Sequence, residues 1–243
     1  MRYIIIGNFG NHSLAVMQAL IVKKLAEVHF IYVETGWADN SWSERVLRCG
    51  EYARRQNVKV HLLKAKASFS EMVVDRKQFP SRKFQWCASF LKGLTILEYL
   101  DEIDPFCEAQ IVLGKRQQDS RRYIDLSEFD HESELYQGRT IWHPLWQTNN
   151  QDFTQLIRSA GFSLLPHPSL ECSPCIHSNL NTLKNLDSFS AKRLEQVEQA
   201  IGQSMFHEPI NYLCTKKEKP QLNEGLTLNQ FDFGCGSAWG CGE

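Results

Sequence analysis

The sequence predicts an α/β fold: a doubly wound, mostly parallel sheet followed by a cysteine-rich C-terminal extension. Short buried strands alternate with helical patterns through the first part of the chain, and a turn of small polar residues follows the first strand. Beyond Pro166 the pattern changes to a cysteine-containing turn, a polar helix and a tail rich in Gly and Cys. We therefore expect an α/β domain over residues 1–165 and a C-terminal element over residues 166–243 packed on it.

Each element is predicted from the period of its apolar residues. Strands are expected at 2–7, 28–36, 58–65, 109–114 and 139–145. Helices are expected at 13–27, 41–57, 70–80, 88–100, 151–161 and 188–204. Ser41 and Glu44 have the spacing of a capping box, and Gly161 is the expected C-terminal residue of its helix. A polar loop over 115–138 and coil over the last 40 residues complete the prediction.

Composition limits the function classes. The 243 residues are 42% hydrophobic, which excludes wholesale disorder. Lys and Arg number 27 against 28 for Asp and Glu, so the overall charge of a dedicated nucleic-acid binder is missing, although a local basic groove remains compatible. No stretch approaches the roughly 20 apolar residues of a membrane helix, and the first apolar run is short for a signal peptide. We expect a cytoplasmic protein without membrane contact.

The turn Gly7–Ser13 is the first candidate functional element. It lies between the first strand and the first helix, where free N–H groups and the positive end of the helix dipole favour phosphate. Glycines and small polar side chains would let a phosphate approach the backbone. Any strand-to-helix turn can carry such residues, so this pattern leaves phosphate binding and an ordinary turn both open.

The cysteines form the second candidate. In a reducing compartment the eight cysteines are better suited to packing, metal binding or thiol chemistry than to disulfides. Cys172 and Cys175 form a CxxC motif, which serves zinc, an iron–sulfur cluster, redox chemistry or no function. The redox alternative is the weaker one, because a thioredoxin-like CxxC opens a helix. Cys235 and Cys241 of the tail could supply further thiolates.

Six sequence blocks, in this order, resemble one known family. They are GNFGNHS (7–13), VETGWAD (33–39), KFQWCASFLK (83–92), VLGKRQQDSRR (112–122), HPLWQTNNQDFTQLIRSAGF (143–162) and ECSPC (171–175). The chain resembles the phosphoadenosine phosphosulfate (PAPS) reductase family of the adenine nucleotide alpha hydrolase-like, or PP-loop, superfamily. The resemblance implies that residues 1–165 are a PP-loop-like domain that binds an adenine nucleotide (PAPS, adenylyl sulfate (APS) or ATP).

The resemblance assigns the nucleotide loop. Its Ser-Gly-Gly-Lys-Asp-Ser motif falls on Asn8, Phe9, Gly10, Asn11, His12 and Ser13. His12 replaces the Asp that would help to hold magnesium in ATP-using relatives, which disfavours ATP hydrolysis. Some PAPS reductases carry a Phe-Gly version of this loop and do not split ATP. Phe9 also has a structural interpretation, as an apolar residue turned into the core.

Further nucleotide and anion positions follow from the same resemblance. Thr35 and Gly36 match the strand-end pair that approaches the adenosine. The block after the 109–114 strand matches the family's anion-gripping segment, with Asp119 in place of Glu; its expected binding residues are Gly114, Lys115, Arg116, Ser120 and Arg122. Arg suits this role because its planar fork can bind a phosphate or sulfate in two places. Lys92 corresponds to a basic position that meets the anion, and we treat Lys92, Arg116 and Arg122 as catalytic candidates.

Cluster-bearing relatives carry a Cys-Cys pair where this chain has Trp86-Cys87. We favour a [4Fe–4S] cluster held by Cys87, Cys172, Cys175 and one tail cysteine, Cys235 or Cys241. Structural zinc held by Cys172, Cys175, Cys235 and Cys241 is the alternative. The tail also partly resembles the reductase segment whose thiolate attacks the sulfate sulfur, which makes Cys241 a candidate nucleophile. A metal ligand cannot also be a free nucleophile, so these two roles compete.

The resemblance implies an oxidoreductase or a sulfurtransferase that reduces an adenylyl sulfate or transfers sulfur, with a thiol electron donor or a sulfur-donor protein as partner. One alternative is ATP-dependent adenylation and thiolation of a nucleic acid, which His12 and the near-neutral charge disfavour. Another, of a different class, is a nucleotide-binding partner subunit that has lost the chemistry.

Overall fold

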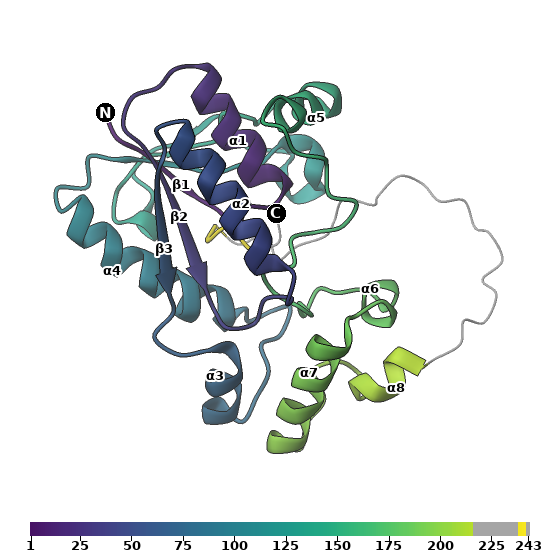
Figure 1. Cartoon of the computed structure of the whole chain (residues 1–243). Helices are drawn as coiled ribbons and strands as arrows, with labels where there is room; N and C mark the ends of the chain where they lie inside the picture. The colour runs from purple at the N-terminus through teal and green to yellow at the C-terminus, as the bar shows by residue number, and fades with distance from the viewer. Residues whose placement is uncertain (216–237, 242–243) are drawn as a thin grey trace.

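The structure is a computed structural model that describes residues 1–215 and 238–241. Its centre is a six-stranded sheet with the strand order β3-β2-β1-β4-β6-β5. All neighbouring strands run parallel except the edge pair β5 and β6. Figure 1 shows helices on both sides of this sheet, with a separate group of helices beyond its carboxyl ends. The predicted doubly wound, mostly parallel α/β class is confirmed.

The expected strands form, each somewhat shorter than its sequence pattern. Their bounds are β1 Tyr3–Ile6, β2 Val28–Glu34, β3 Lys59–Lys64, β4 Gln110–Val112 and β6 Ile141–Trp142. The sequence missed β5 (Phe129–Asp130), which pairs antiparallel with β6 inside the segment expected to be a polar loop. Two exposed residues carry too little alternation to be recognised as a strand.

The helices of the α/β part also follow the prediction. Their bounds are α1 Asn11–Val22, α2 Trp42–Arg55, α3 Phe69–Arg76, α4 Leu94–Ile103 and α5 Asn150–Ser159. Helix α1 ends five residues before the predicted end at Glu27, and Lys24 just beyond it has a left-handed φ of 54°. The predicted 88–100 helix is two elements, because a π-helix, η1 (Cys87–Gly93), leads directly into α4.

The capping box predicted at Ser41 and Glu44 is wrong. Ser41 makes no side-chain cap and instead donates its Oγ to Asp39 Oδ1 at 2.5 Å. A capping box occurs at α3 instead, where Ser68 Oγ accepts from Glu71 N (3.2 Å) and Ser68 N donates to Glu71 Oε2 (2.7 Å). The same Ser-x-x-Glu spacing occurs at both sites, so the backbone conformation of the first residue decides which one forms.

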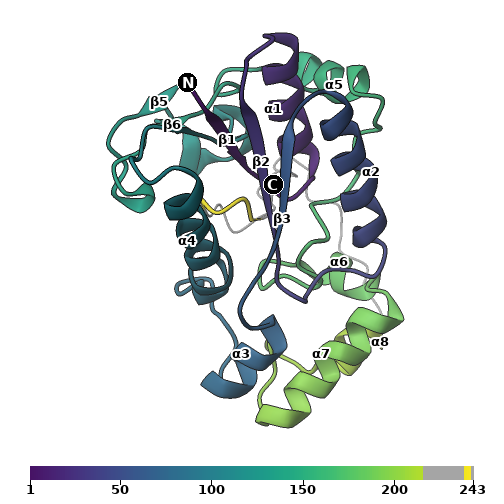
Figure 2. The ribbon, with the colours of Figure 1, turned by 60° about the vertical axis from the view of Figure 1, so that its left-hand side comes forward.

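The C-terminal part contributes three helices, α6 Leu180–Lys184, α7 Ser188–Ile201 and α8 Ile210–Thr215. The predicted polar helix corresponds to α7, whereas the expectation of coil over the last 40 residues is wrong at α8. Residues 216–237 and 242–243, and with them Cys235, lie outside the described residues. We name Ala238–Cys241 the strap; Figure 2 shows it in yellow between α4 and the strands.

Two hydrophobic cores hold the helices against the sheet. Side chains alternate across a strand, so Ile4 and Ile6 of β1 face one core, with η1, α3 and α4, whereas Ile5 faces the other, with α1, α2 and α5. Each of these three isoleucines is at most 2% exposed. The chain leaves β1 in one direction toward β2 and β3, and returns on its other side to β4. Such a reversal opens a crevice at the carboxyl ends of β1 and β4, where ligands bind in this class of fold.

None of the helices in the described ranges is long and apolar enough to cross a membrane.

One buried histidine makes stability depend on pH. Burial, together with the neighbouring charges of His61 and Lys59, lowers the pKa of His29 to about 4. His61 Nε2 lies 3.0 Å from His29 Nδ1, and Tyr99 Oη lies 2.7 Å from His61 Nδ1. In the unfolded chain His29 would titrate near 6.5, so between pH 6.5 and 4 the unfolded state binds the proton that the folded state refuses.

We therefore predict that the free energy of unfolding falls as the pH is lowered from about 6.5 to about 4. The His29→Gln variant should lose less stability over this window, because its side chain cannot take up a proton. Urea unfolding of both proteins at several pH values measures the difference. Parallel pH profiles for the two proteins would contradict the assignment.

Candidate functional site

Side chains of the loop between β1 and α1 hydrogen-bond to one another and to the loop backbone. Asn8 is fully buried, and its Oδ1 accepts from Gly10 N (2.7 Å) and from Ser13 Oγ (3.0 Å). Ser13 Oγ in turn accepts from Asn8 N at 3.0 Å. Helix α1 therefore starts at this loop without a side-chain cap and without an acidic residue in its first turn. An uncapped helix start of this kind favours an anion.

Two loop residues have structural roles. Phe9 is fully buried in the core on the α1 side, where its ring stacks on Phe30 with centroids 4.2 Å apart. Its φ of 62° turns the side chain away from the crevice. Asn11 fastens the loop to the chain after α5: its Nδ2 donates to Leu165 O (3.0 Å) and its Oδ1 accepts from Leu165 N (2.9 Å). The structural interpretation of Phe9 thus matches its position.

His12 faces a carboxylate. Its Nε2 lies 2.9 Å from Asp119 Oδ2. Asp119 also accepts from Arg116, whose Nε and Nη2 lie 2.9 and 2.6 Å from Asp119 Oδ1. Burial alone would raise the pKa of Asp119, but the contacts with His12 and Arg116 outweigh it and lower the pKa. Gly114 lets the 109–114 segment approach His12 closely, because a Cβ at this position would stand 2.8 Å from His12 O.

The sequence predicts Arg116 as an anion-binding residue, whereas the structure commits its guanidinium elsewhere. The side chain is buried, with Nη1 donating to Thr148 O (3.2 Å) and to Asn150 Oδ1 (3.1 Å). Its guanidinium carbon lies 3.9 Å from the centroid of Phe153. Together with Asp119 these contacts use four of its five N–H groups, so Arg116 braces the loop in this arrangement.

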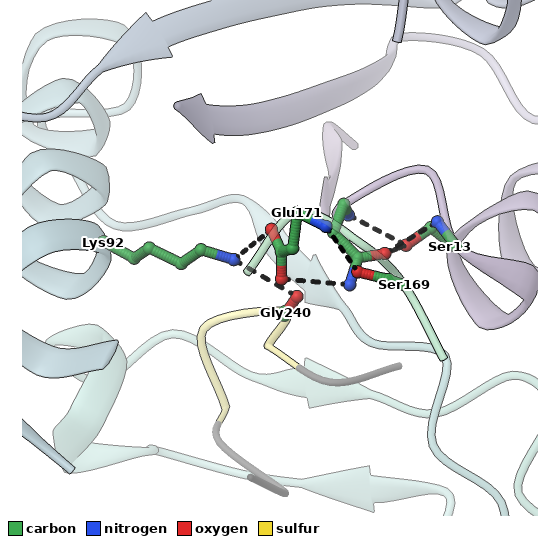
Figure 3. A network of polar contacts seen from close by, with 7 residues as sticks. Ser13, Lys92, Ser169, Glu171 and Gly240 are labelled. Atoms are coloured by element: carbon green, nitrogen blue, oxygen red, sulfur yellow. Dashed lines mark hydrogen bonds and ion pairs between the residues drawn. The ribbon is translucent and has the colours of Figure 1, made fainter. Parts of the chain in front are cut away.

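Lys92 and Glu171 form a buried ion pair at the centre of the site (Figure 3). Lys92 Nζ lies 2.5 Å from Glu171 Oε2, and the other carboxylate oxygen accepts from Asn8 Nδ2 at 3.1 Å. Lys92 Nζ also lies 3.5 Å from Gly240 O of the strap. Burial would lower the pKa of Lys92, but the negative charges of Cys241 and Glu171 raise it. The predicted anion-binding lysine therefore stands between the loop and the cysteines, paired with an internal carboxylate.

Four cysteines line one pocket beside this ion pair, which we name the cysteine pocket. They come from three separate parts of the chain: Cys87 begins η1, Cys172 and Cys175 lie in the turn after Glu171, and Cys241 ends the strap. The pocket encloses about 90 Å³, and Thr35, Lys92, Glu171 and His177 also line it. Among the described residues, no three His, Cys, Asp or Glu side chains form a group that could hold a metal ion as they stand.

The thiols of the pocket influence one another. A hydrogen bond between Cys172 and Cys175 raises the pKa of Cys172 and lowers that of Cys175, so the pair favours a single thiolate. Burial raises the pKa of Cys87, and the nearby Cys241 and Cys175 add to this effect. If several of these cysteines were thiolates, their negative charges would repel one another. A bound metal cation would offset this repulsion, because it binds cysteines in the thiolate form.

The strap reaches the pocket through close contacts with glycines. A Cβ on Gly93 would stand 2.8 Å from the indole of Trp239, and a Cβ on Gly240 would stand 3.1 Å from Gly7 Cα. Trp239 is buried with its ring centroid 4.8 Å from that of Tyr136, and Tyr136 Oη donates to Ala238 O at 2.5 Å. The strap thus passes over the start of the loop and places Cys241 in the cysteine pocket.

The turn after β2 is tied to the cysteine turn. Thr35 lines the pocket, and Gly36 has a φ of 69° that lets the chain turn beside Ser68. Arg193 of α7 donates to backbone carbonyls of both turns; the acceptors are Gly36 (3.3 Å), Trp37 (3.1 Å), Ala38 (3.0 Å) and Ser173 (2.9 Å). Trp37 is fully buried and donates its Nε1 to Pro174 O at 3.0 Å, which makes it a structural residue.

The other predicted anion positions lie outside the cysteine pocket. Lys115 Nζ stands 5.4 Å from the centroid of the Tyr123 ring. Ser120 Oγ accepts from Arg122 N at 3.2 Å and so begins the short helix η3 (Arg121–Tyr123). Arg122 is exposed, and its charge and that of Arg82 act on His177, whose pKa is lowered mainly by burial.

Sequence reasoning missed two residues of the site. Glu171 was part of a recognised block but had no assigned role, and its only signal is a carboxylate directly before a cysteine motif. Trp239 is a large aromatic residue in a run of small ones, GSAWGCG, which is a signal for a side chain that anchors its segment.

The fold and the crevice define a doubly wound α/β protein with a phosphate-type loop at its topological reversal. The model of the phosphoadenosine phosphosulfate reductase domain family matches residues 2–166. This match covers more than half of the chain, so the protein belongs to that family.

Solved structures give more distant likenesses. The PAPS reductase from Candida auris, in a phosphate complex, is 16% identical with a TM-score of 0.49, covering 68% of this chain and 75% of that one. The U34-tRNA thiolase NcsA from Methanococcus maripaludis, with its [4Fe-4S] cluster, is 13% identical with a TM-score of 0.47, covering 90% and 82%. A predicted tRNA methyltransferase subunit from Methanocaldococcus jannaschii is 15% identical with a TM-score of 0.38, covering 86% and 94%. No curated protein matches the chain.

The Lys92–Glu171 pair gives a first prediction for the site. The Glu171→Gln variant leaves a buried lysine without its counter-charge, which should reduce the free energy of unfolding by about 3–5 kcal/mol. Lys92→Met should be similarly costly, whereas the double variant should recover part of the loss because no unpaired charge remains. Urea unfolding of the four proteins measures the coupling. Additive losses in the double variant would show that the two side chains do not act as a pair.

The strap gives a second prediction. Trp239→Ala removes the buried side chain that anchors the strap, and Gly93→Ala adds a Cβ where the Trp239 indole packs. Each change should loosen the strap and expose Cys241. Because burying a large apolar side chain contributes about 1.5–3 kcal/mol, alkylation of Cys241 by iodoacetamide should accelerate about tenfold or more. Peptide mass spectrometry measures the rate, with Leu47→Ala, at an exposed position of α2, as the control. Equal rates in all four proteins would exclude an anchoring role for Trp239.

Proposed function

We propose that this protein is a PAPS-reductase-like enzyme that binds an adenine nucleotide at loop 7–13 and carries out sulfur chemistry beside a cysteine-ligated [4Fe–4S] cluster. The observation that carries the proposal is the gathering of Cys87, Cys172, Cys175 and Cys241 in one pocket next to the loop. Packing alone does not require four thiols from three chain segments to meet at one place.

The donor set fits a cluster chemically. Thiolates are the ligands of [4Fe–4S] clusters, and a buried apolar surrounding tunes such a site. Cys87, Cys172, Cys175 and Cys241 would hold the cluster, which requires the thiols to draw closer together than they stand in this arrangement. When bound, the cluster would supply electrons. Zinc, the alternative, would make the four cysteines structural.

The position of Cys241 disfavours attack by a free tail thiolate. The strap holds Cys241 in the pocket with the other three cysteines, where it would serve as the fourth ligand. Arg116, a catalytic candidate from the sequence that could have stabilised such a thiolate, is paired with Asp119. Lys92 would fix the local charge by holding Glu171 and the strap carbonyl, so that the nucleotide and the reacting sulfur meet between the loop and the pocket.

The loop favours a nucleotide bound without magnesium. Mg²⁺ prefers carboxylate and phosphate oxygens, and the loop offers His12 where ATP-using relatives carry Asp. The two carboxylates that contact the loop are already paired, Asp119 with His12 and Arg116, and Glu171 with Lys92. Uncapped N–H groups at the start of α1 would receive the phosphate or sulfate. Calorimetry with PAPS, APS and ATP, with and without Mg²⁺, tests this part of the proposal.

The metal centre is tested by anaerobic purification followed by an absorption spectrum and quantitation of iron, sulfide and zinc. We predict a broad absorption band at about 400 nm together with bound iron and sulfide. The iron and the sulfide should be lost in Cys172→Ser and reduced in Cys241→Ser. Cys107→Ser, a half-buried cysteine outside the pocket, is the matched control. A colourless protein with stoichiometric zinc would show that the cysteines hold zinc and not a cluster. A metal-free protein that still binds nucleotide would overturn the proposed chemistry and favour the nucleotide-binding subunit.

A further inference from the structure

One segment of this nearly neutral chain is strongly basic. Between residues 76 and 97 there is no Asp or Glu, and five basic residues occur; they are Arg76, Lys77, Arg82, Lys83 and Lys92. Arg76 lies over the rings of Trp86 (5.1 Å) and Phe90 (4.6 Å). Arg82 and Lys83 remain exposed on the loop before η1, followed by Phe84, which is 59% exposed.

This loop lies at the mouth of the cysteine pocket. Gln85 Nε2 lies 3.0 Å from Nε2 of His177, which lines the pocket, and the same amide lies 3.3 Å from Arg82 O. The loop therefore brings the positive charges of Arg82 and Lys83 to one side of the pocket.

The charges at the mouth differ from those inside. Lys92 is neutralised by Glu171 and Arg116 by Asp119, so neither basic side chain of the interior presents a net charge to a ligand. Within residues 1–215 and 238–241, no ion pair involves Arg82 or Lys83. The available positive charge is thus spread along the outside of the site, where it suits a chain of phosphates better than one small anion.

We propose that Arg82, Lys83 and Phe84, here named the basic rim, bind a single-stranded nucleic acid beside the cysteine pocket. The cations would contact successive phosphates, and Phe84 would stack on an unpaired base. A duplex would leave Phe84 without a partner, because its bases are already stacked. The rim goes beyond the proposed function: it assigns a binding partner and does not depend on which metal, if any, the cysteines hold.

The test uses fluorescein-labelled oligonucleotides of about 15 nucleotides, single-stranded RNA, single-stranded DNA and duplex DNA, with fluorescence anisotropy over a range of KCl concentrations. We expect single strands to bind more tightly than duplex, with an affinity that falls steeply as salt rises. Arg82→Glu/Lys83→Glu should weaken binding about tenfold or more and lower the salt slope by about two. Phe84→Ala should weaken it about fivefold or more.

The control is Arg54→Glu/Arg55→Glu, which makes the same charge change at two exposed positions of α2. It should leave binding unchanged. Equal affinities for rim and control variants, no binding of any oligonucleotide at low salt, or equally rim-dependent binding of polyglutamate would overturn the proposal. Metal content of the rim variants is measured in parallel and should equal that of the wild type, so failure of the rim and failure of the metal centre give different results.

Discussion

The ion pair between Lys92 and Glu171 is the interaction on which the site depends. Its two partners are 79 residues apart, and through them four segments meet: η1, the loop after β1, the cysteine turn and the strap. A charge on either partner alone would be expensive in this buried position, since desolvation costs several kcal/mol per ion. The fold therefore has to bring both together, and in doing so it brings the cysteines close to the loop after β1.

A second buried pair repeats this principle on the other side of the loop. Asp119 receives His12 and Arg116, and it binds the first turn of α1 to the segment after β4. The two pairs make the interior of the site nearly neutral although it contains several charged groups. Unpaired positive charge is found instead on exposed side chains such as Arg82 and Lys83, outside this interior.

Local patterns predicted the fold well because they are properties of neighbouring residues. The alternation of β1 and the helical period of α2 need no distant partner to be recognised. The capping box shows the limit: Ser41 and Ser68 share one motif, and only backbone geometry separates them. The site was harder. Cys87 and the CxxC motif were marked by chemistry, but the neutralisation of Lys92 and Arg116 depends on tertiary contacts that no spacing encodes.

Arg193 connects a C-terminal helix to the α/β part of the chain. The family match ends at residue 166, yet this arginine, from a helix beyond that point, joins the turn after β2 to the cysteine turn through backbone carbonyls. The end of the family match therefore does not coincide with the end of the segments that support the site. A fragment that ends at residue 166 would keep every strand of the sheet but lose the cysteine turn, Arg193 and the strap.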